Sequence, residues 1–151
     1  DDTITEAAAG TGTIDADGGD GDRITTFTYD AFGNVVSITG AEGNSTLLEH
    51  DAQGNVIKRT DARNHEWLFE YDDAGNLVRV ENPLGHEESY EYDGVGNLTR
   101  HTDATDAATE FVYNRQNRLV EQIDALGHSW HYEYDGGGRL VEASGPAGRV
   151  L

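Results

Sequence analysis

A residue pair, Tyr or His followed by Asp or Asn, recurs every 21 residues with no register skipped. The six pairs begin at Tyr29, His50, Tyr71, Tyr92, Tyr113 and Tyr134. A fixed period of this length is typical of chains that stack one supersecondary unit many times. Each unit then buries its apolar surface only against its neighbours, so the sequence predicts a quasi-one-dimensional array.

Each 21-residue unit contains two tetrapeptides that predict turns. The first position is usually Asp or Asn, and the fourth is Gly, Asn or Asp. This combination is typical of a type I turn whose last residue is left-handed and starts a bulge. Both prolines, Pro83 and Pro146, fall at the second position of a turn, where a fixed φ is favourable. First turns are predicted at 30–33, 51–54, 72–75, 93–96, 114–117 and 135–138, and second turns at 40–43, 61–64, 82–85, 103–106, 124–127 and 145–148.

The segments between the turns have the length and the pattern of short β-strands. Before each first turn, larger residues alternate with polar ones, as at Trp67, Phe69 and Tyr71. Period two predicts a sheet with one packed face and one face in water. The strand after a first turn opens instead with two adjacent apolar residues, such as Val56 and Ile57, except that Thr99 follows Leu98 in one copy. We attribute this pair to a β-bulge beside the turn, which directs the first of the two toward the packed face.

The composition excludes several classes of function. With 29 acidic and 10 basic residues, the net charge of −19 argues against nucleic-acid binding, which needs clustered Lys and Arg. No cysteine is present, which excludes disulfides, a thiol nucleophile and a thiolate metal site. No apolar run reaches the length of a membrane span and no leader opens the chain, so no membrane insertion is expected. The chain starts at Asp1 and the repeat ends abruptly, from which we expect a segment of a longer polypeptide.

The motif Tyr-Asp-x-x-Gly-Asn/Arg-Leu, as in residues 71–77 and 134–140, resembles that of the RHS (rearrangement hotspot) or YD-repeat family. The resemblance covers Arg23 to Leu151, with six copies in register. Two copies depart from it: His50 replaces the tyrosine in one, and Asn114 and Asn117 replace the Asp and Gly of another.

The resemblance implies an all-β fold of repetitive antiparallel β-hairpins, about twelve short strands, forming a curved sheet that is part of a hollow RHS-type β-shell. Such shells occur in RHS-type polymorphic toxins, in the C components of Tc toxins, and in wall-associated or teneurin-like YD proteins. We divide the chain into a degenerate or flexible lead-in, residues 1–22, and an array of 21-residue units, residues 23–151. The structural repeat motif is assigned to Tyr29, Asp30, Gly33, Asp51, Gly54, Tyr71, Asp72, Gly75, Tyr92, Asp93, Gly96, Tyr113, Tyr134, Asp135 and Gly138.

The function implied by the resemblance is a non-enzymatic structural segment of a shell that encapsulates a toxin or secreted cargo. The expected partners are the remainder of the same polypeptide and an enclosed C-terminal domain, and the expected location is secreted or at the cell surface. The alternative is a surface recognition module in which aromatic residues such as Trp67 and Trp130 bind glycan or a partner protein. A glycan-cleaving enzyme fragment is a third, weaker interpretation, because no acid is singled out by a departure from the repeat. No catalytic residue and no cofactor are assigned.

Two groups of residues raise the question of a metal site. Asp15, Asp17, Asp20 and Asp22 lie in a glycine-rich stretch that could place oxygens around calcium, although we favour a solvated connector. His65, His86 and His128 occupy the same position after three second turns. Equivalent residues one repeat apart are separated by two strand spacings, about 9–10 Å. One ion cannot span that distance, so we interpret these residues as surface turn histidines.

Overall fold

The computed structural model describes residues 5–7, 11–15 and 24–149, with side chains from residue 25 onward. All regular structure in these residues is β, as predicted. The fifteen strands are β1 (Thr5–Ala7), β2 (Thr11–Asp15), β3 (Ile24–Tyr29), β4 (Val35–Thr39), β5 (Ser45–His50), β6 (Val56–Thr60), β7 (Glu66–Tyr71), β8 (Leu77–Glu81), β9 (Glu87–Tyr92), β10 (Leu98–Thr102), β11 (Ala108–Tyr113), β12 (Leu119–Ile123), β13 (Ser129–Tyr134), β14 (Leu140–Gly145) and β15 (Gly148–Arg149). The predicted set of about twelve corresponds to β3–β14, and β1, β2 and the two-residue β15 are additional.

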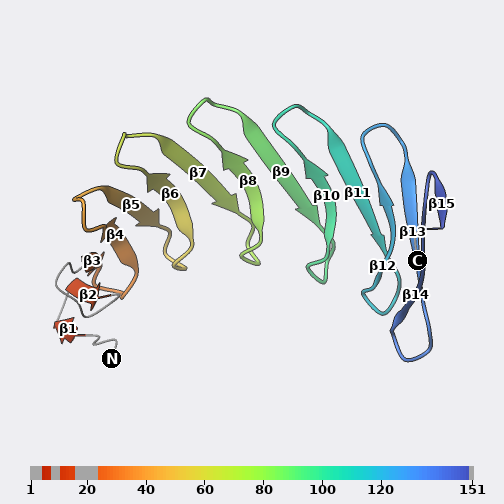
Figure 1. Cartoon of the computed structure of the whole chain (residues 1–151), viewed down its shortest axis with the longest axis horizontal. Helices are drawn as coiled ribbons and strands as arrows, with labels where there is room; N and C mark the ends of the chain where they lie inside the picture. The colour runs from red at the N-terminus through yellow and green to blue at the C-terminus, as the bar shows by residue number, and fades with distance from the viewer. Residues whose placement is uncertain (1–4, 8–10, 16–23, 150–151) are drawn as a thin grey trace. The chain divides into compact units, whose positions relative to one another are not determined.

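The chain divides into two compact units, Asp1–Glu70 with Asn82–Leu84, and Tyr71–Glu81 with Gly85–Leu151. In the first unit, β1 to β7 follow one another in chain order, each antiparallel to the next. In the second unit, β8 to β15 do the same (Figure 1). Only hairpin connections are needed for this order, as the repeat predicts.

The predicted turns are confirmed by their backbone geometry. In the turn 93–96, the amide of Gly96 donates to the carbonyl of Asp93 at 3.0 Å, and the amide of Asp93 donates to the carbonyl of Asn97 at 2.9 Å. The fourth residue is left-handed in every first and second turn. Glycine at this position has φ between +76° and +105°, and Asn64, Asp106 and Asn117 have φ of 63°, 64° and 57°. Gly, Asn and Asp therefore stand where the backbone requires them.

A β-bulge follows the turn, as the paired apolar residues predicted. Tyr92 lies opposite Leu98 and Glu91 lies opposite Arg100, which leaves Thr99 as the extra residue of β10. Leu98 is therefore on the same face as Tyr92. The same register shift occurs in the pairs β3–β4, β5–β6, β11–β12 and β13–β14.

The face that carries the tyrosines of the repeat is called the aromatic face below, and the opposite face the polar face. Along β7, exposure alternates as predicted: Trp67, Phe69 and Tyr71 are half-buried, and Glu66, Leu68 and Glu70 are exposed. The predicted packed face is only partly realised, because no side chain described by the structure is fully buried. Within the described part of each unit, no second layer covers the aromatic face, so the residues of this face pack sideways against one another.

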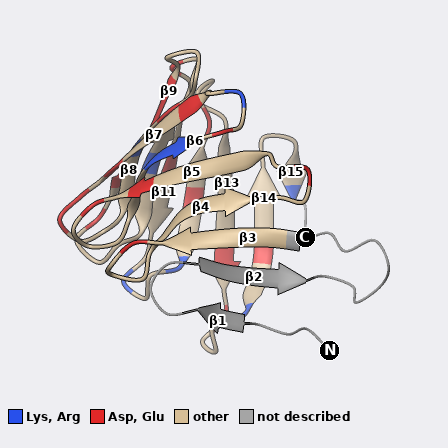
Figure 2. Cartoon of the chain, turned by 90° about the vertical axis from the view of Figure 1, so that its left-hand side faces the viewer, with Lys and Arg blue, Asp and Glu red and all other residues tan. Residues whose placement is uncertain are grey.

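The polar face carries cross-strand ion pairs between a central cation and glutamates of the neighbouring strands. Lys58 on β6 lies 2.6 Å from Glu66 and 3.6 Å from Glu49. Arg100 on β10 lies 3.5 Å from Glu110 and 3.9 Å from Glu91. Asp and Glu outnumber Lys and Arg on the strands and turns (Figure 2). Since these pairs are solvated, they favour register and solubility more than stability. No helix in the described residues has the length and hydropathy to cross a membrane.

Candidate functional site

The structure brings the residues of the repeat motif together at the first turns. Each tyrosine, or His50, is the last residue of its strand, the Asp or Asn begins the turn, and the Gly or Asn117 is its left-handed fourth residue. The strands that end this way are β3, β5, β7, β9, β11 and β13.

The Asp of a first turn accepts hydrogen bonds from three donors. The Oδ1 of Asp93 accepts from the backbone amides of Val95 and Asn97 at 3.0 and 2.9 Å, and its Oδ2 accepts from the Asn97 side-chain amide at 2.9 Å. These bonds, that from the Asn97 side chain above all, hold the pKa of Asp93 below its usual value, although burial opposes the shift. The same three bonds occur at Asp30, Asp51 and Asp72. The carboxylate is thus a built-in cap of the turn.

After the second turns 61–64 and 124–127, a histidine takes the place of that asparagine. The Nδ1 of His65 lies 2.9 Å from Oδ2 of Asp61, and the Nδ1 of His128 lies 2.9 Å from Oδ2 of Asp124. Both histidines are exposed turn residues, as predicted. Among the residues for which the structure describes side chains, no three His, Asp or Glu converge in a way that could hold a metal. Asp17, Asp20 and Asp22 lie outside the described residues, as does the side chain of Asp15.

The tyrosine hydroxyl closes the open end of a hairpin. Tyr92 on β9 donates to the carbonyl oxygen of Leu77 on β8 at 2.9 Å, and Tyr134 on β13 donates to that of Leu119 on β12 at 2.8 Å. The ring therefore covers the aromatic face while the hydroxyl satisfies a backbone acceptor beside the bulge. At His50, which lacks a hydroxyl, Nδ1 is buried without a hydrogen-bond partner in the described residues.

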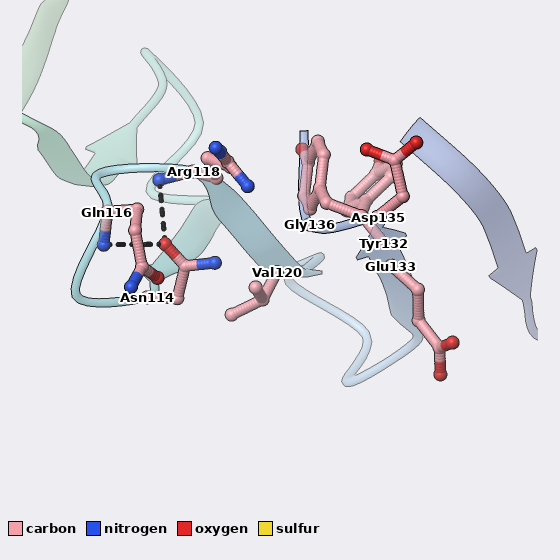
Figure 3. A pocket seen from close by; sticks show the side chains of 9 residues that line it. Asn114, Gln116, Arg118, Val120, Tyr132, Glu133, Asp135 and Gly136 are labelled. Carbon is pink, nitrogen blue, oxygen red and sulfur yellow. Dashed lines mark hydrogen bonds between the residues drawn. The ribbon is translucent and has the colours of Figure 1, made fainter. Parts of the chain in front are cut away.

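Neighbouring first turns touch along one edge of each unit. In the second unit, the side-chain amide of Asn97 donates to Oδ1 of Asn117 at 3.4 Å, and the guanidinium of Arg118 lies over the ring of Tyr134, 5.7 Å from its centroid. In the first unit, a Cβ at Gly54 would lie 3.3 Å from Oδ1 of Asn34. The residue after the turn therefore reaches the next turn at Asn34, Asn97 and Arg118. A recess of about 550 Å³ lies beside the turn 114–117 (Figure 3).

The structure also reveals a polar cluster on the aromatic face that the sequence analysis missed. The hydroxyl of Tyr90 donates to Oε2 of Glu88 at 3.0 Å, and Nε2 of His101 lies 3.2 Å from the same oxygen. The rings of Tyr90 and His101 stack with centroids 4.8 Å apart. Burial, followed by the nearby Glu88, raises the pKa of Tyr90.

A signal for this cluster was present in the sequence. Glu88 occupies the position that Trp67 and Trp130 occupy in other repeats, so it is an acid singled out by a departure from the pattern. The expectation that no acid departs from the repeat was wrong. Oε2 of Glu88 links β9 to His101 on β10. The aromatic face therefore includes a polar group at this repeat.

Two family models match the chain. The model described as Teneurin YD-shell matches residues 12–125, and the model described as RHS Repeat matches residues 113–150. The chain belongs to the teneurin YD-shell family. The Tyr-Asp turns described above are the repeats of this YD-shell chain. A search of curated proteins finds no match.

Solved structures share the YD-shell fold of this chain. The crystal structure of TcdB2-TccC3-Cdc42 has a TM-score of 0.67 at 17% identity and covers 89% of this chain. That of TcdB2-TccC3-TEV has a TM-score of 0.68 at 16% identity, with 90% covered. The Photorhabdus luminescens Tc holotoxin pore gives 0.57 at 16% identity, with 92% covered. This chain spans only 10% of the length of each matched chain. At these identities the likeness shows the fold alone, and it confirms the predicted RHS-type architecture.

Proposed function

We propose that this chain is one stretch of the wall of an RHS-type shell that encloses a toxin or another secreted cargo. The wall itself does no chemistry in this proposal. Membership of the YD-shell family and the fold shared with chains of Tc toxin structures support it. Within this proposal, residues 23–151 are the repeat array and residues 1–22 lead into it.

One observation carries the proposal: an aromatic face that no described residue covers. A domain that stands alone buries such a face against a second layer. Here Trp67, Phe69 and Tyr71 remain half-buried, and no described side chain is fully buried. A single-layer sheet with one face of this kind suits a wall whose aromatic side looks onto an enclosed space and whose charged side meets water.

The hydrogen bonds of the motif residues fit a structural role. In the turn 93–96, both oxygens of Asp93 accept bonds from the turn itself, and the hydroxyl of Tyr92 is used to close a hairpin. The Asp93 oxygens and the Tyr92 hydroxyl therefore hold the register of the array, and their hydrogen bonds are already used within the fold. We therefore assign the motif residues to wall construction and assign no catalytic residue.

The proposed partners are the remainder of the same polypeptide and a C-terminal domain inside the shell. Secretion or display at the cell surface follows from a role in delivering or presenting such a cargo. The fold is shared with structures of TcdB2-TccC3-Cdc42 and of the Photorhabdus luminescens Tc holotoxin pore, and this likeness supports the setting.

Protease protection of the protein as its host produces it tests the proposal. An enclosed domain is expected to survive a protease dose that digests the same domain when it is expressed alone. Gly96→Val, which strains a turn of the wall, is expected to expose the cargo, whereas Gly94→Val in the same turn leaves it protected. Equal digestion of enclosed and free cargo would refute the shell role. Specific binding of the isolated chain on a glycan array would favour surface recognition instead.

A further inference from the structure

One first turn departs from the repeat in its charge. Residues 114–118 read Asn-Arg-Gln-Asn-Arg and carry two positive charges and no negative one, whereas residues 93–97 carry only the negative charge of Asp93. This change occurs in a chain with a net charge of −19. The turn nevertheless has the ordinary backbone, because Oδ1 of Asn114 accepts from the amides of Gln116 and Arg118 at 2.9 and 3.1 Å. The substitutions therefore change the chemistry of the edge without changing the turn.

Neither arginine of this turn has an ion-pair partner among the residues that the structure describes. Arg115 is exposed, and Arg118 is half-buried against the ring of Tyr134. A Cβ at residue 138 would collide with the Arg118 guanidinium, so Gly138 provides the space in which that group lies. The carboxylate of Asp135, which lines the recess beside this turn, is already engaged, since its Oδ2 accepts from Nε and Nη2 of Arg139, each at 2.7 Å.

The Arg118 guanidinium borders the recess described above. The side chains of Asn114 and Gln116 form one side, Tyr132 lies on the other, and Arg118 lies between them (Figure 3). Tyr134 also lines the recess. Glu133 and Asp135 also line the recess, but the Glu133 side chain points away from Arg118 in this view. The groups left to bind a ligand are therefore the Arg118 guanidinium, the Nδ2 amide of Asn114 and the carboxamide of Gln116.

We propose that this recess binds an acidic peptide segment, with a carboxylate of the peptide on the guanidinium of Arg118. The planar guanidinium, here 5.7 Å from the centroid of the Tyr134 ring, presents parallel N–H donors that match a carboxylate bidentately. Oδ1 of Asn114 is used by the turn, so this side chain offers a peptide only its Nδ2 donor, whereas the Gln116 carboxamide can donate and accept. An acidic sugar fits less well, because Arg118 covers the face of Tyr134 on which a sugar ring would stack. This site goes beyond the wall role and does not depend on an enclosed cargo.

The test is an NMR titration of the 151-residue chain with tetraglutamate at low ionic strength, following the Arg118 Nε–H and the Asn114 and Gln116 side-chain amides. Saturable shifts at these groups are expected with tetraglutamate, and none with tetraglutamine. Shifts produced by trigalacturonate but not by tetraglutamate would overturn the peptide assignment. An absence of shifts with millimolar tetraglutamate would overturn the site.

Two variants separate binding from folding. Arg118→Gln is expected to weaken tetraglutamate binding at least tenfold, whereas Arg59→Gln, which removes an arginine stacked on Trp67 at 4.3 Å, leaves it unchanged. Asn114→Asp restores the carboxylate found at Asp93 and Asp135, so its turn is expected to fold, and the new charge should compete for Arg118 and weaken binding at least tenfold. Wild-type affinity in a folded Asn114→Asp or Arg118→Gln variant would overturn the proposal.

Discussion

The turn 93–96 offers a matched pair of glycines on which the account of the array can be tested. Gly96 has φ of +89°, whereas Gly94 lies outside the left-handed region, and a Cβ added at either position would meet no atom within 4 Å. Steric crowding is therefore the same for both substitutions. Any difference between alanine at position 96 and alanine at position 94 reports the backbone conformation alone.

The magnitude follows from this geometry. An L-residue in the left-handed region costs about 1–2 kcal/mol, so Gly96→Ala should destabilise the fold by that amount. Gly94→Ala should be neutral or stabilise by up to about 1 kcal/mol, because alanine restricts the unfolded chain. Gly96→Asn should fall between wild type and Gly96→Ala, since Asn64 and Asn117 already occupy the equivalent position. Valine at position 96, or at Gly75 with φ of +85°, should cost more than alanine because it is β-branched.

Two assays measure the effect. A difference of about 2 kcal/mol between the two alanine variants corresponds to about 4–8 °C in Tm for a chain of this size. Because repeat arrays open locally, hydrogen exchange of the β9 and β10 amides is the sharper readout, and protection there should fall about 30-fold in Gly96→Ala relative to Gly94→Ala. Equal Tm and equal protection in the two alanine variants would refute the reasoning about the turn.

Three further predictions follow from the contacts of the motif. His50→Tyr should stabilise the first unit by about 1 kcal/mol, because a tyrosine hydroxyl at this position can reach the Val35 carbonyl, as the hydroxyl of Tyr92 reaches that of Leu77. A lower denaturant midpoint in the variant would contradict this. Tyr134→Phe should cost about 1 kcal/mol and raise hydrogen exchange at the β12–β13 hairpin, whereas unchanged exchange would show that the hydroxyl bond is dispensable. Hydrogen bonds lower the pKa of Asp93 in the folded state. The Asp93 carboxylate therefore stabilises the fold at pH values above its unfolded pKa of about 3.9. This stabilisation is lost as the pH falls through the lower pKa of the folded state. Asp93→Asn, which keeps an Oδ1 acceptor as Asn114 does, should therefore lose less stability than wild type when acidified below about pH 4, and identical acid unfolding curves would count against the cap.

Much of the local structure could be predicted from the sequence because each element has its own chemical signature. The left-handed backbone at the fourth position of a turn favours Gly, Asn or Asp there, and this pattern allowed all twelve turns to be predicted. The adjacent pair Val56 and Ile57 could not both face one side of a regular strand, and this conflict pointed to the bulge now seen in the register of β5 and β6.

Other features depend on contacts that no local pattern encodes. Alternation identifies which face of β7 carries Trp67 and Tyr71, but not whether anything covers that face. The role of the Tyr92 hydroxyl depends on the Leu77 carbonyl, which is 15 residues away in the sequence. The Glu88 and His101 pair was missed because the strand pairing that brings the two together is visible only in the structure, although Glu88 itself breaks the repeat.

The most direct test of the wall proposal is a cryo-EM structure of the protein as its host produces it. The proposal predicts a closed shell in which the face bearing Trp67, Tyr92 and Tyr134 lines an interior that contains additional density. A structure with this face covered by a tightly packed second sheet, or exposed on the outside of the particle, would contradict it.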